Sequence, residues 1–305
     1  GGCDLSCRVR YAPRQALLNT IYKEINDMKF TEKLKRGSST CFTGKFDRDA
    51  FRQYAAAGID CVELSTNYNN YFNVTGFVDR PEDYAHIAAD EGVEIWSVHL
   101  PFSRKLDISN EDKELRAITL YTDRAMIRAS ARAGAKVIVL HPSSEPIDDE
   151  RRPERLRLSR EAIISLNEEC EKNGVLLAVE DLPRTCLCNR SGEMVSLLTG
   201  TGAGAVFDTN HALFEDNADF IDALTAGGIK IHTLHISDYF RDAAGVLDER
   251  HVLPGEGIND WDAIIAALER HGYSGPVMYE VPARPKTHET PSTFAELADN
   301  MRRFF

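Results

Sequence analysis

The chain has 305 residues, of which 43% are hydrophobic and 28% are charged, and its formal net charge is −12. This composition is that of a soluble globular protein, and the acidic balance argues against a large nucleic-acid footprint, which needs clustered lysine and arginine. No apolar run approaches the roughly 18 residues of a membrane-spanning helix, so we expect neither nucleic acid nor a membrane as a partner.

Residues 1–32 differ from the pattern that follows them. Apolar residues recur at helical spacing between Ala12 and Met28, which predicts a helix there. No linker composition interrupts the rest of the chain. We therefore expect an N-terminal helical extension at 1–32 and one domain at 33–305.

From Lys35 onward, short apolar runs alternate with longer amphipathic stretches. The runs have the length and composition of strands. They occupy residues 35–41, 60–64, 93–99, 136–141, 175–180, 205–208, 231–237 and 276–280. The stretches between them predict helices at 47–57, 81–91, 111–133, 153–173, 190–199, 217–227, 260–271 and 291–304. Eight such alternations predict an α/β fold in which a parallel sheet closes into a (β/α)₈ TIM barrel.

Ionisable residues gather where these predicted strands end. They are Glu63, His99, His141, Glu180, Asp181, Asp208, His211, His235, Asp238, His251 and Glu280. Singly, each has an ordinary explanation, since a lone histidine finds local hydrogen-bond partners and a strand-end aspartate caps the next helix. In a barrel, however, all of them meet at one rim. So many buried carboxylates and imidazoles need a compensating cation, and they are ordinary ligands of a divalent metal, which we predict here.

Side-chain alternation separates inward from outward residues within the strands. In IHTLHIS (231–237), His235 faces the barrel interior and His232 faces the helices. The same rule applied to the third strand places Trp96 on the outer face together with Val98.

Seven cysteines are scattered along the chain. Their odd number and lack of repeated metal-type pairs indicate reduced thiols in a cytoplasmic protein. Cys186 and Cys188 form a CxC pair that could chelate a metal, but the further cysteines of a zinc site do not accompany it.

Four segments resemble the xylose-isomerase-like barrel superfamily, which includes sugar and sugar-phosphate isomerases and epimerases and also endonuclease IV. The segments are FDTNH (207–211), LHISD (234–238), HVLPGEG (251–257) and VMYEVP (277–282), and the resemblance covers residues 35–305. These motifs are specific for the superfamily and say little about the substrate.

The resemblance to ketose epimerases implies one divalent metal and no organic cofactor. The implied ligands are Glu180, Asp208, His235 and Glu280. Manganese, zinc, magnesium and cobalt all fit such ligands. The resemblance also implies that Glu180 and Glu280 exchange a substrate proton through an enediolate beside a metal-polarised carbonyl.

The same resemblance implies two substrate contacts. His211 and Arg241 would bind oxygens of a sugar or sugar phosphate, although a surface ion pair explains Arg241 equally well. Glu63 is expected to bind the substrate or to stabilise a neighbouring histidine. The segment YNNYF (68–72) is expected to form an aromatic lid. Homodimers and homotetramers are both compatible with the superfamily.

Endonuclease IV is the main competing reading, because it uses this barrel with three zinc ions. Its further ligands correspond to His99, His141, His211, His251 and Glu249, where that family has aspartate. A duplex-binding enzyme needs basic, intercalating rim loops, whereas SSEPIDDE (143–150) is acidic. The resemblance is also compatible with a keto-inositol dehydratase and with a non-catalytic sugar-binding barrel.

Overall fold

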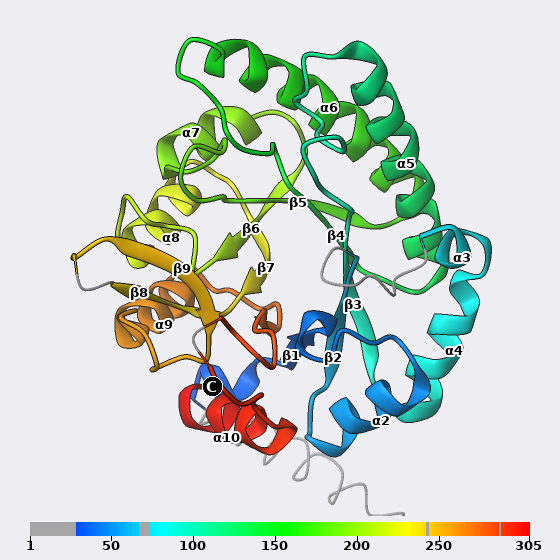
Figure 1. The fold of residues 1–305 in the computed structure, drawn as a ribbon, viewed down its shortest axis with the longest axis vertical. Helices are drawn as coiled ribbons and strands as arrows, with labels where there is room; N and C mark the ends of the chain where they lie inside the picture. Colours follow the sequence, from blue (N-terminus) through cyan, green and yellow to red (C-terminus); the bar gives the residue numbers. More distant parts are fainter. Residues whose placement is uncertain (1–28, 67–73, 242–243, 287) are drawn as a thin grey trace, which may run out of the picture.

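The computed structural model describes residues 29–66, 74–241, 244–286 and 288–305. Eight parallel strands form one sheet in the order β10-β1-β2-β3-β4-β5-β6-β7. The sheet curves into a ring, and helices surround it (Figure 1). The predicted (β/α)₈ barrel is therefore confirmed.

The ring closes along a narrow seam between β7 and β10, the two strands at the ends of the sheet order. Ile236, just beyond β7, forms a parallel bridge with Tyr279 of β10. The Ile236 amide donates to Met278 O at 2.7 Å, and the Glu280 amide donates to Ile236 O at 3.1 Å. This seam places the end of β7 beside the residue that follows β10.

At each end, the barrel strands follow the predicted apolar runs within one or two residues. They are β1 (Arg36–Ser39), β2 (Cys61–Ser65), β3 (Glu94–His99), β4 (Val137–Leu140), β5 (Leu176–Glu180), β6 (Gly204–Asp208), β7 (Ile231–His235) and β10 (Val277–Tyr279). A short 3₁₀ turn, Thr40–Phe42, replaces the end of the first predicted strand.

The helices lie outside the ring. They are α2 (Arg48–Ala56), α3 (Val74–Asp79), α4 (Pro81–Glu91), α5 (Lys113–Arg132), α6 (Arg152–Asn173), α7 (Ser191–Leu198), α8 (Asn217–Ala226), α9 (Trp261–Arg270) and α10 (Phe294–Phe304). A 3₁₀ turn at Thr31–Lys33 precedes β1. None of the helices in the described ranges is long and apolar enough to span a membrane.

Local sequence signals fix several helix ends. The Asp47 side chain accepts the Ala50 amide at 2.9 Å, and Asp260 accepts the Ala263 amide at 3.0 Å, so each caps its helix N-terminus. Gly174 ends α6 with φ 70°, a left-handed conformation that glycine adopts without strain. These caps start and stop the helices where the predicted pattern changes.

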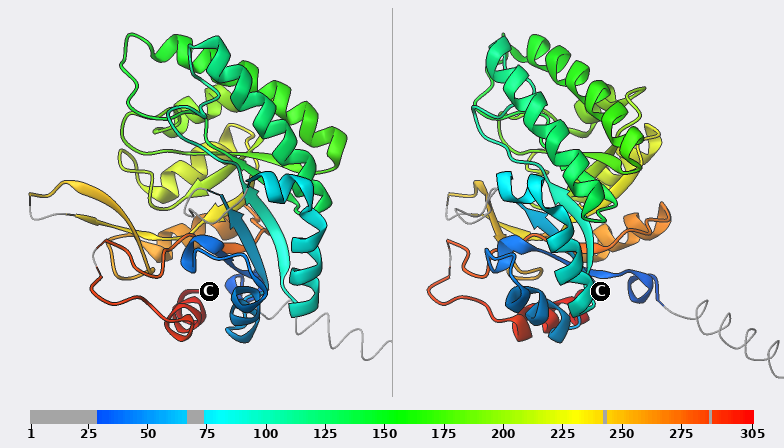
Figure 2. Two further views of the ribbon diagram at one scale, coloured as in Figure 1. Left: turned by 45° about the vertical axis from the view of Figure 1, so that its right-hand side comes forward. Right: turned by 90° about the vertical axis from the view of Figure 1, so that its right-hand side faces the viewer.

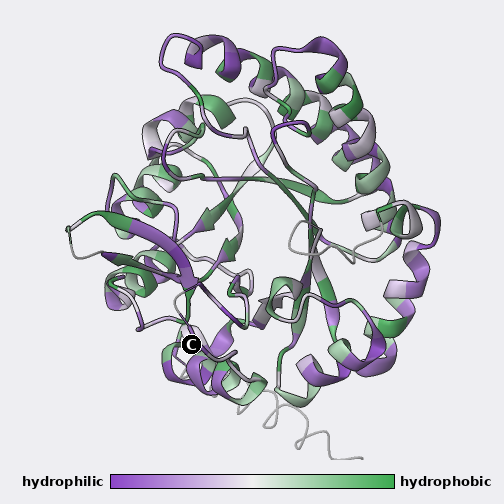
Figure 3. Cartoon of the chain, in the orientation of Figure 1, coloured by the Kyte–Doolittle hydropathy of each residue, from purple (hydrophilic) through white to green (hydrophobic). Residues whose placement is uncertain are grey.

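Two apolar layers hold the barrel together. The larger layer lies between the sheet and the helices and includes Phe51, Phe77 and Phe207. A smaller cluster consists of Val137, Val139, Ala178 and Val206. Figure 3 shows hydrophobic residues along the strands and hydrophilic residues over much of the helix surface.

The prediction that Trp96 faces the helices is wrong. Its side chain packs on the smaller cluster, which includes Val139 and Ala178, and not on the larger layer between the sheet and the helices. The register between β2 and β3 shifts there, because Val62 pairs with Ile95 while the next residue, Glu63, pairs with Ser97. Trp96 is the extra residue of a β-bulge, and simple alternation fails at such a point.

The sequence did not predict α3 or an antiparallel hairpin between β7 and α9. The hairpin pairs β8 (Asp238–Arg241) with β9 (Leu247–Val252) and projects from the barrel (Figure 2). The predicted helix at 12–28 and the predicted lid at 68–72 lie outside the described residues.

A buried carboxylate fastens the loop that follows β9. Asp238 accepts the amides of Gly255 at 2.9 Å, Gly257 at 3.2 Å and Asn259 at 2.9 Å, and also the indole N–H of Trp261 at 3.1 Å. The chain approaches so closely that a Cβ on Gly257 would lie 2.4 Å from Tyr239 O. The segment 254–257 (PGEG) thus packs closely against the Asp238 carboxylate.

Candidate metal centre and active site

The C-terminal ends of four strands meet in one buried group. Glu180, Asp208 and His235 are the last residues of β5, β6 and β7, and Glu280 directly follows β10. All four are at most 4% exposed. Each offers one ligand atom to a set in which all atoms lie within 4.8 Å of one another. The structure therefore brings together the four residues predicted to hold one metal.

His235 contacts each carboxylate of this central group through one ring nitrogen. Its Nδ1 lies 3.0 Å from Glu180 Oε1, 3.2 Å from Glu280 Oε2 and 3.9 Å from Asp208 Oδ2. Three carboxylates around one imidazole carry more negative charge than the ring can balance. Such a group fits a divalent cation.

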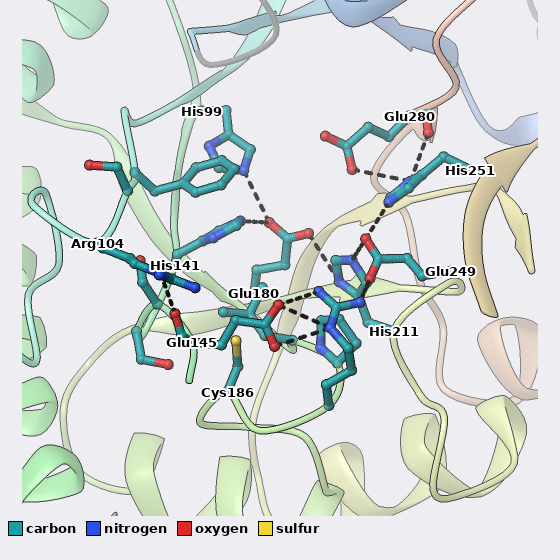
Figure 4. Close-up of a pocket in the computed structure, with 17 residues that line it drawn as sticks. His99, Arg104, His141, Glu145, Glu180, Cys186, His211, Glu249, His251 and Glu280 are labelled. Atoms are coloured by element: carbon teal, nitrogen blue, oxygen red, sulfur yellow. Dashed lines mark hydrogen bonds and ion pairs between the residues drawn. The ribbon is translucent and has the colours of Figure 1, made fainter. Parts of the chain in front are cut away.

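Two histidines approach the second oxygen of Glu180. His99 Nε2 and His141 Nε2 each lie 3.2 Å from Glu180 Oε2 (Figure 4). His99 Nδ1 lies 2.9 Å from the Leu100 carbonyl, which fixes the orientation of the ring. Phe102 stacks on His141 with ring centroids 3.7 Å apart and gives this side an aromatic wall.

Two further histidines face Glu249 on the opposite side. His211 Nδ1 lies 2.8 Å from Asp181 O, and His251 Nδ1 lies 3.2 Å from Glu280 O. With both Nδ1 atoms beside carbonyls, the Nε2 atoms point to Glu249 Oε1, at 3.8 Å for His211 and 3.2 Å for His251. Asp208, His211 and His251 can also hold a metal ion by their spacing.

Strained backbone supports this side of the site. His251 has φ 48° and Arg184 has φ 55°, both in the left-handed region that such residues rarely adopt. Arg184 forms ion pairs with Glu145, at 2.8 Å, and with Glu249. The guanidinium thereby ties the loops after β4 and β5 to the hairpin.

These groups surround a cavity of about 350 Å³, within the range of about 300–1,000 Å³ typical of small-molecule sites. Glu180 and Glu280 both line it, as do His99, His141 and His211 (Figure 4). Arg104, Arg184 and Cys186 also contribute to its wall. A small polar molecule entering the cavity would meet both glutamates.

Burial and the histidines shift the carboxylates in different directions. Burial raises the pKa of Asp208 to about 6, although His211 and His251 lower it. Burial also acts on Glu180 and Glu280, but His235 opposes it, which holds the pKa of Glu180 well below its usual range and brings that of Glu280 to about 2. The two glutamates are therefore carboxylates at neutral pH.

Glu63 lies where the second of its two expected roles, contact with a neighbouring histidine, would place it, whereas Arg241 lies away from the cavity. Among the described residues, the cavity lining includes neither of them. Glu63 is fully buried and contacts His235. Arg241 is exposed at the end of β8 and donates to Gly245 O at 2.8 Å, within the hairpin. The structure thus brings His211 to the cavity but not Arg241.

The residues of the cavity wall that sequence reasoning missed include Phe102, Arg104, Glu145 and Arg184. All of them lie in loops that directly follow β3, β4 or β5. Their position after the strand ends was a usable signal, because the loops of that barrel face form active sites. Of the two cysteines of the CxC pair, only Cys186 lines the cavity within the described chain. The pair therefore does not present two thiols to a metal in this cavity.

Comparison with known proteins shows the family and the fold of the chain. The chain matches the family described as Xylose isomerase-like TIM barrel over residues 51–304. The inosose isomerase of Bacillus velezensis is 30% identical over 167 residues, which cover 52% of this chain and 58% of that protein. The inosose isomerase of Bacillus subtilis is 29% identical over 181 residues, which cover 57% of this chain and 63% of that protein. The matched segments span less than two thirds of these relatives.

Solved structures share the fold at low sequence identity. A D-tagatose 3-epimerase-like protein has a TM-score of 0.72 and 21% identity, covering 88% of this chain and 96% of that one. D-psicose 3-epimerase of Clostridium cellulolyticum H10 has a TM-score of 0.70 and 18% identity, and the match covers 89% of this chain and 99% of that one. A xylose isomerase-like TIM barrel protein of Mycobacterium smegmatis, in complex with magnesium, has a TM-score of 0.66 and 17% identity. That match covers 91% of this chain and 97% of that one.

Proposed function

Because the chain belongs to the xylose isomerase-like TIM barrel family, we propose that it is a divalent-metal-dependent isomerase or epimerase of a sugar, sugar phosphate or keto-polyol. The observation that carries this proposal is the central group of Glu180, Asp208, His235 and Glu280, with both glutamates facing the cavity. Dehydration of a keto-inositol would begin with the same proton removal.

The donor set fits a metal ion. Among the described residues, Asp208 Oδ2 is buried and forms no hydrogen bond, although His211 Nδ1 lies 3.4 Å away. A buried carboxylate oxygen left without a hydrogen bond is costly unless a cation pairs with it. When bound by these four residues, a manganese, zinc, magnesium or cobalt ion supplies Lewis-acid polarisation of a carbonyl.

Glu180 and Glu280 are the proposed acid and base. They come from β5 and from the end of β10, and both reach the cavity. Either glutamate, as a carboxylate, can remove a proton from a carbon beside a carbonyl, and the other, once it has taken up a proton from water, can return that proton to the resulting enediolate. His211 and Arg104, which also line the cavity, would bind substrate oxygens.

The similar proteins support a small polyhydroxylated substrate. The two Bacillus relatives described above are inosose isomerases, and two of the similar structures are a D-psicose 3-epimerase and a D-tagatose 3-epimerase-like protein. We further propose a cytoplasmic location, supported by five free, buried cysteines in the described chain. A homodimer or homotetramer is the expected assembly.

Proton exchange tests this function directly. In deuterium oxide, the metal-loaded protein is expected to exchange the proton beside the carbonyl of an inosose or a ketohexose. Glu280→Gln should slow this exchange by roughly 10²–10⁴-fold, because an amide cannot accept the proton. The matched control, Glu154→Gln on the exposed face of α6, should exchange at the wild-type rate. Wild-type exchange rates in Glu280→Gln would remove Glu280 from the acid–base role.

One observation favours a second function, a multi-zinc phosphodiesterase or endonuclease. Two further ligand groups flank the central one: His99 and His141 share Glu180 with it, and His211 and His251 share Asp208. Elemental analysis of protein purified without added metal or chelator separates the two functions. About one ion per chain supports the isomerase, whereas two or three zinc ions favour phosphoester substrates.

A further inference from the structure

Glu63 lies inside the barrel beneath the central group. It belongs to β2 and is fully buried. Both of its carboxylate oxygens lie 3.2 Å from His235 Nε2. A buried carboxylate at such a distance from a ring nitrogen forms a charge-assisted hydrogen bond when that nitrogen carries a proton.

The imidazole of His235 separates Glu63 from the other carboxylates. Its Nδ1 faces Glu180 and Glu280, at 3.0 and 3.2 Å, while its Nε2 faces Glu63. The two ring nitrogens point in different directions, so Glu63 cannot reach an ion held at Nδ1. To bind a cation through Nδ1, the ring must carry its proton on Nε2, where Glu63 accepts it.

A second side chain holds Glu63 in place. Ser97 Oγ donates a hydrogen bond of 2.7 Å to Glu63 Oε2. Ser97 is also the register partner of Glu63, because the bulge at Trp96 shifts β3 by one residue. Without that shift, Trp96 would be the register partner of Glu63, and the Ser97 hydroxyl would no longer lie opposite the carboxylate. The bulge therefore places a hydroxyl where the carboxylate needs one.

We propose that Glu63, oriented by Ser97, is a positioning residue that fixes the tautomer and orientation of His235 and thereby sets the affinity of the central group for a divalent ion. The inference rests on the proposed metal site and assigns no substrate contact to Glu63. Carboxylates that accept the distal N–H of a ligating histidine raise its basicity, and their loss typically costs about 10–100-fold in metal affinity.

Metal affinity gives the first test. Zinc binding to protein freed of metal is measured by competition with a chromophoric chelator for the wild type, Glu63→Ala, Glu63→Gln and Ser97→Ala. Glu63→Ala should weaken binding by about 10–100-fold. Glu63→Gln should recover most of this loss, since its amide oxygen still accepts the Nε2 proton, and Ser97→Ala should lose less than Glu63→Ala. Glu94→Ala, on the same sheet but paired with Lys35, is the matched control and should bind zinc normally.

The histidine spectrum gives a second test that needs no substrate. In protein labelled with ¹⁵N-histidine, the Nε2 proton of His235 should exchange slowly in the wild type and in Glu63→Gln, and it should be lost in Glu63→Ala. Substitution of His235 assigns the signal, and urea unfolding verifies that each variant is folded. A folded Glu63→Ala that keeps both the slow proton and wild-type zinc affinity would overturn the proposal. If the wild type bound no divalent ion, the proposed function would fail, and the Nε2 signal would still decide the role of Glu63.

Discussion

Two arginines compete for the role of holding a substrate oxygen. Arg241 follows the resemblance to ketose epimerases, but its side chain is exposed and bonds Gly245 within the hairpin. Arg104 lines the cavity and donates from Nε to Glu145 O at 3.0 Å. The geometry therefore favours Arg104 as the guanidinium that reaches the substrate.

Substituting the two arginines separates these roles. We expect Arg104→Ala to raise KM by about 10–150-fold with a smaller effect on kcat, because a lost charge-assisted hydrogen bond costs about 1.5–3 kcal/mol. Arg241→Ala should leave both constants nearly unchanged. Steady-state kinetics on the best substrate measure both effects. The reverse result would restore the role that the resemblance gives to Arg241.

Asp123 of α5 is a buried carboxyl group far from any proposed function. It is 1% exposed, and its Oδ2 forms no hydrogen bond within the described chain. Burial raises its pKa to about 8, and the charge of Arg124 opposes this shift. The folded protein thus favours the protonated form, and stability is lost as pH rises from the unfolded value of about 3.9 towards 8.

Asp123→Asn imitates the protonated form and should remove this loss. At about pH 4, close to the unfolded pKa, the variant and the wild type should have similar free energies of unfolding. At pH 8 the variant should be more stable by an amount on the order of 2–4 kcal/mol. Urea denaturation at both pH values measures the difference. Parallel pH profiles for the two proteins would show that Asp123 carries no such penalty.

Residue positions could be predicted only where strand alternation is regular. The rule places His235 inside the barrel, where it contacts Glu180. It misplaces Trp96, because the bulge inserts one residue between β2 and β3. A bulge of this kind leaves no mark in the hydrophobic pattern, so neither the inward turn of Trp96 nor the contact between Ser97 and Glu63 could be read from the sequence.

At the level of elements, the barrel was predictable and the hairpin was not. Each barrel strand after β1 is an apolar run, and each predicted helix has an amphipathic pattern. β9, in contrast, reads LDERHV and carries Glu249 and His251 to the cavity. Its charges serve the site, so the hydrophobic signal of a strand is absent there. α3 spans only six residues, too few for a helical period to stand out in the sequence.

The loop fastened by Asp238 should be sensitive to any added side chain. In Gly257→Ala, the new methyl group would lie 2.4 Å from Tyr239 O and 2.6 Å from Asp238 Oδ1, so the loop must move. We expect a loss of stability of about 2 kcal/mol or more and reduced activity, because the same loop follows β9 and His251. Thermal unfolding and activity assays measure the two effects.

Gly192→Ala is the matched control for that prediction. Gly192 lies in α7, and a Cβ there meets no atom within 4 Å. Alanine is favoured over glycine by up to about 1 kcal/mol inside a helix, and Gly192 lies in the first turn of α7. The control should therefore be neutral or slightly stabilised. Equal destabilisation of both variants would mean that the fit around Gly257 is not the cause.

For the whole molecule, the charge distribution opposes binding to nucleic acid. The net charge is −12, and the loop 143–150 at the rim is acidic. We therefore expect no cleavage of a duplex with an abasic site, and no binding that strengthens steeply when salt is lowered to about 50 mM. Gel-shift and cleavage assays with zinc-loaded protein measure this. Salt-dependent binding followed by cleavage would support an endonuclease instead of an isomerase.

The seam of the ring links its closure to the site. β7 carries His235, and β10 precedes Glu280, so these two candidate ligands stand on either side of the place where the sheet closes. An ion shared by them would cross-link the two ends of the sheet, which the short bridge at Ile236 and Tyr279 otherwise joins. Metal loading and completion of the barrel would then be one cooperative event, and the unmetallated ring would be weakest where β10 joins it.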